Sequence, residues 1–118
     1  SSSRGGLIMP GNPVYTREPR VDETLNHGSK TVTTAGTPVQ LSTSSVPCIE
    51  VLIQVKRGNT GRIYIGGAGV PNNDSAGIML DIPTAGQTPP SVPITAQNLN
   101  QIYINSTVNG EGVNFLYW

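Results

Sequence analysis

The feature that most constrains this chain is a series of short apolar runs with a two-residue period, separated by glycine- and proline-rich turns. The clearest run extends from Cys48 to Lys56. In it Ile49, Val51, Ile53 and Val55 share one face, whereas Glu50, Gln54 and Lys56 share the other. Because successive side chains of a strand point to opposite faces, this alternation is typical of a β-strand with one buried side.

Further runs of the same kind predict about eight short strands and no helix. The other strands are expected at Thr31–Thr34, Val39–Leu41, Arg62–Ile65, Ile78–Ile82, Val92–Ile94, Gln101–Asn105 and Val113–Trp118. Two turns look like hairpins, residues 57–61 between the strands at 48–56 and 62–65, and residues 109–112 before the last strand. The pattern predicts an all-β, single-domain β-sandwich or jelly roll over residues 31–118.

Residues 1–30 differ from the rest and predict an extended N-terminal arm. The segment holds four of the seven basic residues and three prolines, and it has no helical or alternating period. Its short apolar pieces and arginines could bind a partner, because an extension of this kind is either disordered or ordered by what it contacts. The candidate partner-binding residues in the arm are Arg4, Leu7, Ile8, Met9, Val14, Tyr15, Arg17 and Arg20.

The chain is poor in charge. Charged residues make up 12% of the sequence and the formal net charge is zero, against about 25% charged residues in an ordinary soluble domain. The chain is either a neutral β-domain kept soluble by amides and hydroxyls, or one whose surface is largely buried against other subunits. With equal numbers of basic and acidic residues, the chain has no excess of positive charge that would indicate nucleic-acid binding. No apolar stretch approaches the ~18 residues of a membrane helix.

No motif predicts catalysis, a metal, a cofactor or a small-molecule substrate. Cys48 and His27 are the only residues of their types and lie in different kinds of segment. The glycines at 66–69 are not followed by a helix that could receive a phosphate, so a bend or close backbone approach explains them better. We therefore expect a non-enzymatic protein.

The C-terminal segment 115–118 holds half of the six aromatic residues. One interpretation is a last strand whose alternate aromatic residues fill the core. The other assigns Trp118 to a subunit contact, because aromatic side chains contribute strongly to interfaces. Trp118 therefore joins the candidate partner-binding residues.

Four segments carry a resemblance to a known group of proteins. They are GTPVQLST (36–43), VPCIEVLIQVKRGNTGRIYIGG (46–67), NLNQIYIN (98–105) and NGEGVNFLYW (109–118). In this order they resemble small structural proteins of tailed-phage virions, in particular jelly-roll decoration or cement proteins. The resemblance implies a homotrimer on the outer capsid surface that binds the major capsid protein. It implies no catalytic residues.

The resulting expectation is a capsid decoration protein that stabilises the assembled shell, with the arm lying across capsid subunits. The alternative is a tail, fibre or collar component, or a receptor- or carbohydrate-binding module that uses the loops at 70–75 and 84–90. Neither loop contains an aromatic residue that could stack on a sugar.

Overall fold

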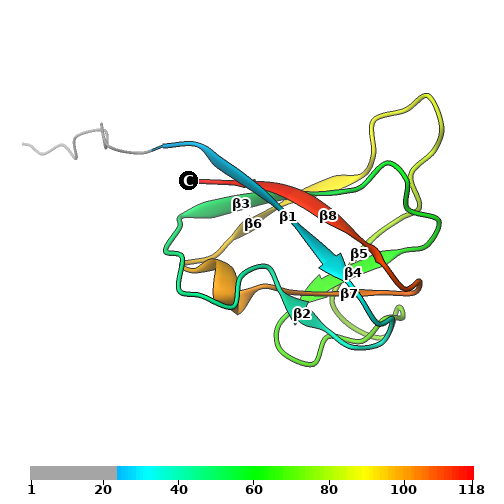
Figure 1. Ribbon diagram of the computed structural model, residues 1–118, viewed down its shortest axis with the longest axis horizontal. Helices are drawn as coiled ribbons and strands as arrows, with labels where there is room; N and C mark the ends of the chain where they lie inside the picture. Colours follow the sequence, from blue (N-terminus) through cyan, green and yellow to red (C-terminus); the bar gives the residue numbers. More distant parts are fainter. Residues whose placement is uncertain (1–23) are drawn as a thin grey trace, which may run out of the picture.

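The computed structural model describes residues 24–118 and confirms an all-β sandwich of two antiparallel sheets (Figure 1). Sheet A has the strand order β1-β8-β3-β6, and sheet B has the order β2-β7-β4-β5. The strands are β1 (Asn26–Val32), β2 (Val39–Gln40), β3 (Glu50–Val55), β4 (Ile63–Gly66), β5 (Ile78–Leu80), β6 (Ser91–Thr95), β7 (Tyr103–Ser106) and β8 (Glu111–Tyr117). One 3-10 turn, η1 (Leu99–Gln101), precedes β7.

The antiparallel pairs are nested along the chain. β1 pairs with β8 and β2 with β7, while β3 pairs with β6 and β4 with β5. The first half of the chain, β1 to β4, therefore pairs in reverse order with the second half, β5 to β8, and the pairs alternate between the two sheets. Pairing of β8 with β3 and of β7 with β4 joins the pairs within each sheet.

Both expected hairpins are wrong. β3 belongs to sheet A and β4 to sheet B, so the turn at residues 57–61 carries the chain from one sheet to the other. The turn at 109–112 does the same between β7 and β8, and Gly110 adopts a φ of +79° there. Turn residues show that the chain changes direction, but they do not show whether the next strand stays in the same sheet.

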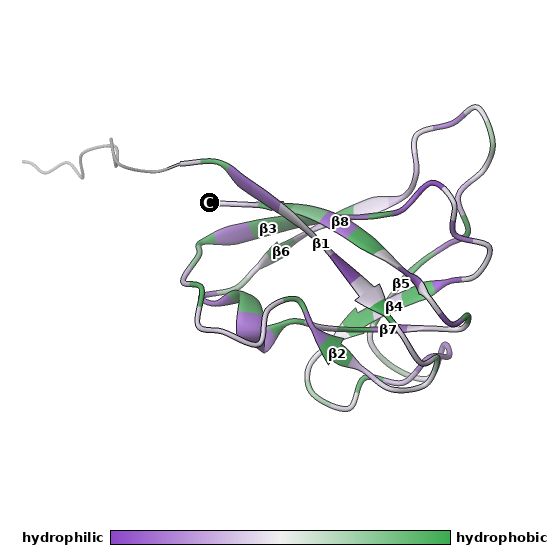
Figure 2. Ribbon diagram, viewed as in Figure 1, coloured by the Kyte–Doolittle hydropathy of each residue, from purple (hydrophilic) through white to green (hydrophobic). Residues whose placement is uncertain are grey.

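Strand β1 begins at Asn26, before the boundary expected at residue 30. Its sequence NHGSKTV is mostly hydrophilic (Figure 2), so local preference does not predict a strand. Pairing with β8 along seven residues stabilises it instead. Gly28 is required here, because a Cβ at that position would lie 2.8 Å from the ring of Phe115. Of the expected arm, residues 1–23 lie outside the described residues.

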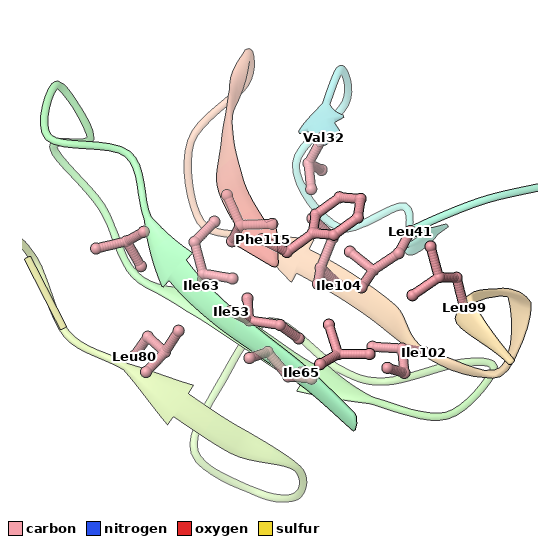
Figure 3. Packing of buried hydrophobic residues seen from close by; sticks show 13 residues of the cluster. Val32, Leu41, Ile53, Ile63, Ile65, Leu80, Leu99, Ile102, Ile104 and Phe115 are labelled. Atoms are coloured by element: carbon pink, nitrogen blue, oxygen red, sulfur yellow. The ribbon is translucent and has the colours of Figure 1, made fainter. Parts of the chain in front are cut away.

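The core lies between the sheets and contains the predicted inward residues (Figure 3). Val51, Ile53 and Val55 alternate in β3 with less buried neighbours, as expected. Ile49, expected on this buried face, lies before the strand begins and is 41% exposed. The remaining fully enclosed members come from both sheets and include Val32, Ile63, Ile104 and Val113.

Candidate partner-binding surface

Of the candidate partner-binding residues, the structure describes only Trp118. The others (Arg4, Leu7, Ile8, Met9, Val14, Tyr15, Arg17 and Arg20) lie outside the described residues. Trp118 is half-buried at the end of β8. Its carbonyl accepts hydrogen bonds from the Ile49 and Glu50 amides, at 2.6 and 3.3 Å, and its amide donates to the Glu50 carbonyl at 3.3 Å. The main chain of Trp118 therefore extends the pairing of β8 with β3.

The aromatic residues before Trp118 fill the core, as one of the two interpretations predicted. Phe115 is buried and Tyr117 packs against the core cluster. Their ring centroids are 5.9 Å apart with an interplanar angle of 38°, which is a favourable tilted geometry for an aromatic pair.

The outer face of sheet A presents two rows of side chains that cross all four strands. Because Val32, Val51 and Phe115 point inward, the alternate residues point outward. The strand register places His27, Leu116, Leu52 and Pro93 side by side in one row. The adjacent row consists of Ser29, Asn114, Gln54 and Ser91.

All residues of these two rows except Pro93 line a groove of about 590 Å³, which we call the sheet A groove. Among residues 24–118, no Asp, Glu, Lys or Arg lines it. The Gln54 amide nitrogen donates to the Pro89 carbonyl at 3.2 Å, whereas the side chains of Asn114 and Ser91 make no hydrogen bond within residues 24–118. The groove thus combines a mostly apolar row, which ends at His27, with a row of uncharged donors and acceptors. It suits a neutral, partly apolar ligand or protein segment.

The groove lies next to the point where the N-terminal segment enters the sandwich. His27, Gly28 and Ser29 of the edge strand β1 form one side of the groove. Leu25, directly before that strand, is 62% exposed. The N-terminal end of β1 therefore borders the sheet A groove.

Cys48 has the environment of a structural thiol. Its Sγ donates a hydrogen bond to the Ala96 carbonyl at 3.1 Å. Burial raises the pKa of the Cys48 thiol, which reduces the thiolate fraction. No group of three or more His, Cys, Asp and Glu side chains within residues 24–118 is placed to hold a metal ion.

The carboxylate of Glu111 holds the turn that leads from sheet A to sheet B. Its Oε2 accepts bonds from the amide and the hydroxyl of Thr60, at 2.7 and 2.8 Å, and its Oε1 accepts one from the Gly61 amide at 2.9 Å. Burial acts to raise the pKa of Glu111, but these hydrogen bonds outweigh burial and the net shift is downward.

Asn59, in the same turn, is buried, and its Nδ2 donates to the Gly112 carbonyl at 2.8 Å. The side chains of Asn59 and Glu111 therefore both fix the turn between the two sheets.

The loop at 70–75, considered above as a sugar-binding loop, uses its polar side chains within the chain. Asn72 donates to the Ser106 carbonyl at 3.2 Å, and Asp74 accepts a 2.7 Å bond from the Tyr64 hydroxyl. That bond is the main cause of the raised pKa of Tyr64. Of the nearby glycines, Gly66 has a packing reason, since a Cβ there would lie 2.9 Å from the Val70 side chain, and Gly69 adopts a φ of +84°.

Comparison with known proteins adds no family. No family model, curated protein or solved structure matches the chain. Among residues 24–118, no helix is long and apolar enough to cross a bilayer.

Sequence reasoning missed the sheet A groove, although one signal for it was present. Leu52 and Leu116 are apolar residues at positions that the alternation assigns to the solvent side of their strands. An apolar side chain on the polar face of a strand can indicate a contact surface. The assembly of these residues into rows depended on the pairing of β8 with both β1 and β3.

Proposed function

We propose that this protein is a non-enzymatic virion structural protein, a decoration or cement protein that binds the assembled capsid of a tailed phage. In this proposal it sits on the outer capsid surface, contacts the major capsid protein and associates as a homotrimer. The resemblance of residues 36–118 to such proteins motivates the proposal. The antiparallel two-sheet sandwich with nested strand pairs supports the jelly-roll fold that the resemblance implies.

The observation that carries the proposal is the sheet A groove beside the N-terminal end of β1. Within residues 24–118 the groove combines an apolar row with an Asn114 amide and a Ser91 hydroxyl that have no hydrogen bond, and it lacks Asp, Glu, Lys and Arg; it resembles the centre of a protein interface more than an ordinary solvated surface. The N-terminal segment would contact the same partner. Ordering it costs about 1–2 kcal/mol per residue in backbone entropy, so a subunit lattice, which offers an extended surface, suits it as a partner.

Binding to the assembled shell alone would stabilise that shell by mass action, because the protein would then favour the assembled over the dissociated state. This mechanism requires no catalytic group.

The test is a binding assay with phage shells assembled without the protein. Three forms are compared: the full chain, a form starting at Thr24, which retains all of β1, and the Leu116→Lys variant. Leu116 is 36% exposed and points into the groove, so a lysine there places a charge at the proposed contact without disturbing the core.

Ile49→Lys is the matched control, because Ile49 is similarly exposed at 41% and lies outside the groove. We expect the full chain and Ile49→Lys to bind, and Leu116→Lys and the shortened form to bind at least about tenfold more weakly. Undiminished binding by Leu116→Lys would remove the groove from the proposal. Absence of shell binding by the full chain would refute the function itself.

One observation favours a second candidate function, a carbohydrate- or receptor-binding module of a tail, fibre or collar. The uncharged row of Ser29, Asn114, Gln54 and Ser91 could hydrogen-bond sugar hydroxyls while Leu52 and Leu116 contact the ring. Titration with neutral oligosaccharides tests it. Saturable binding that Leu116→Lys abolishes, together with no shell binding, would favour this candidate.

A further inference from the structure

The edge of sheet B carries the densest exposed apolar cluster on the described surface. Among residues 24–118, six large hydrophobic side chains are exposed, and three of them lie within five residues: Ile78 (49% exposed), Met79 (40%) and Ile82 (43%). We call these three residues the β5 cluster. Isolated exposed apolar residues are common, whereas several of them within one short segment can mark a contact surface.

The cluster extends around an open side of the sandwich. Leu80 is buried in the core, so Ile78, two residues before it, points toward the gap between the sheets, and Met79 points to the outer face of sheet B. Beside Ile78 is a second groove, of about 310 Å³, lined in part by Ile65 and Ile102 of sheet B and by Ile94 of β6. An apolar side chain from a neighbouring molecule could enter this groove.

The strand edges on this side favour contact through side chains over addition of a strand. β5 has only three residues, and β6, the edge of sheet A, carries Pro93, which has no amide hydrogen to donate. These two edges therefore expose few backbone hydrogen-bonding groups to which a strand of another molecule could add. The surface that remains available is the apolar cluster and its groove.

The charges beside the cluster suit a second copy of the same chain. Arg62 and Asp81 form an ion pair of 3.2 Å, and their side chains are 45% and 61% exposed. The surface next to the cluster thus bears one positive and one negative group, so an identical surface offers each of them an opposite charge. The formal net charge of the chain is zero, so two copies have no net repulsion to overcome.

We propose that the β5 cluster and its groove form the surface through which copies of this chain associate. The proposal names the interface for the self-association included in the proposed function and rests on it to that extent. It places that interface at β5 and at the inward-facing Ile94 of β6, on residues that do not line the sheet A groove, so self-association would leave that groove free to bind a shell.

The test uses the full-length protein alone, without any shell. Light scattering coupled to size exclusion gives the mass from about 10 µM to about 1 mM, a range that detects even weak association. We expect a trimer of the 12.4 kDa chain, the state included in the proposed function. We expect Met79→Lys to weaken the association at least about tenfold, because a charge would be buried at the contact.

Ile49→Lys is again the matched control and should keep the mass of the parent protein. Met79→Ser provides a milder change if the lysine variant does not fold, and circular dichroism identifies that case. A monomer at every concentration would overturn the proposal, and so would an oligomer that survives both Met79 variants. Neither result bears on shell binding, which the earlier assay measures separately.

Discussion

Replacing Glu111 by glutamine should destabilise the sandwich, because this side chain connects the sheet-crossing turn to the start of β8. Glutamine keeps one acceptor oxygen, so it cannot accept from both the Thr60 groups and the Gly61 amide. One or two hydrogen bonds to a charged acceptor are lost. At this half-buried position we expect a loss of about 1–3 kcal/mol in the free energy of unfolding at pH 7.

The pH dependence follows from the lowered pKa of Glu111. A carboxyl group whose pKa is lower in the folded state stabilises the protein above its unfolded pKa, and this contribution is lost as the pH falls through the folded value. The difference between wild type and Glu111→Gln should therefore be constant near neutral pH and shrink between about pH 5 and pH 3.

Urea denaturation at a series of pH values measures both effects. The control is Glu50→Gln, since the Glu50 side chain makes no hydrogen bond within residues 24–118. It should change stability by less than about 0.5 kcal/mol at pH 7. A Glu111→Gln protein as stable as wild type would refute the reasoning, and so would a deficit that is undiminished at pH 3.

Three further predictions concern packing and the thiol. Gly112→Ala should lower stability by more than about 3 kcal/mol or prevent soluble expression, because a Cβ there would collide with the backbone of β1. Gly58 has open space around it, so the control Gly58→Ala should be tolerated. Equal losses of stability in the two variants would contradict this prediction. Ile53→Ala should cost about 2–5 kcal/mol in chemical denaturation, since Ile53 is fully buried; a cost under about 1 kcal/mol would show a core that collapses around the cavity. The Cys48 thiol should react with a disulfide reagent more slowly in the native protein than in urea, and faster as the pH rises, because its pKa is raised. Equal native and denatured rates would contradict the raised pKa.

The groove and the β5 cluster lie on different parts of the sandwich and have different chemistry. The groove combines leucines with uncharged polar groups, whereas the cluster combines isoleucine and methionine with an ion pair. A protein that associates with itself and also binds an assembly needs two such surfaces. This separation allows variants to affect one property and leave the other unchanged.

The sequence by itself determined the local character of the strands. The alternation from Val51 to Val55 identified a strand with one buried face, and the glycine-, proline- and asparagine-rich segments marked the places where the chain turns. The low charge also followed from the composition. These properties depend on neighbouring residues, so periodicity and turn chemistry are sufficient to predict them.

Only the tertiary structure decided which strands pair. β1 exists because β8, from the far end of the chain, supplies its hydrogen-bonding partner, and its own residues have little preference for a strand. The two turns expected to form hairpins instead cross between sheets, where Asn59 and Glu111 hold the first of them. Leu52 and Leu116 became neighbours through the same long-range pairing. A two-residue period tells which side of a strand is apolar, but the partner strand is selected by packing across the whole sandwich.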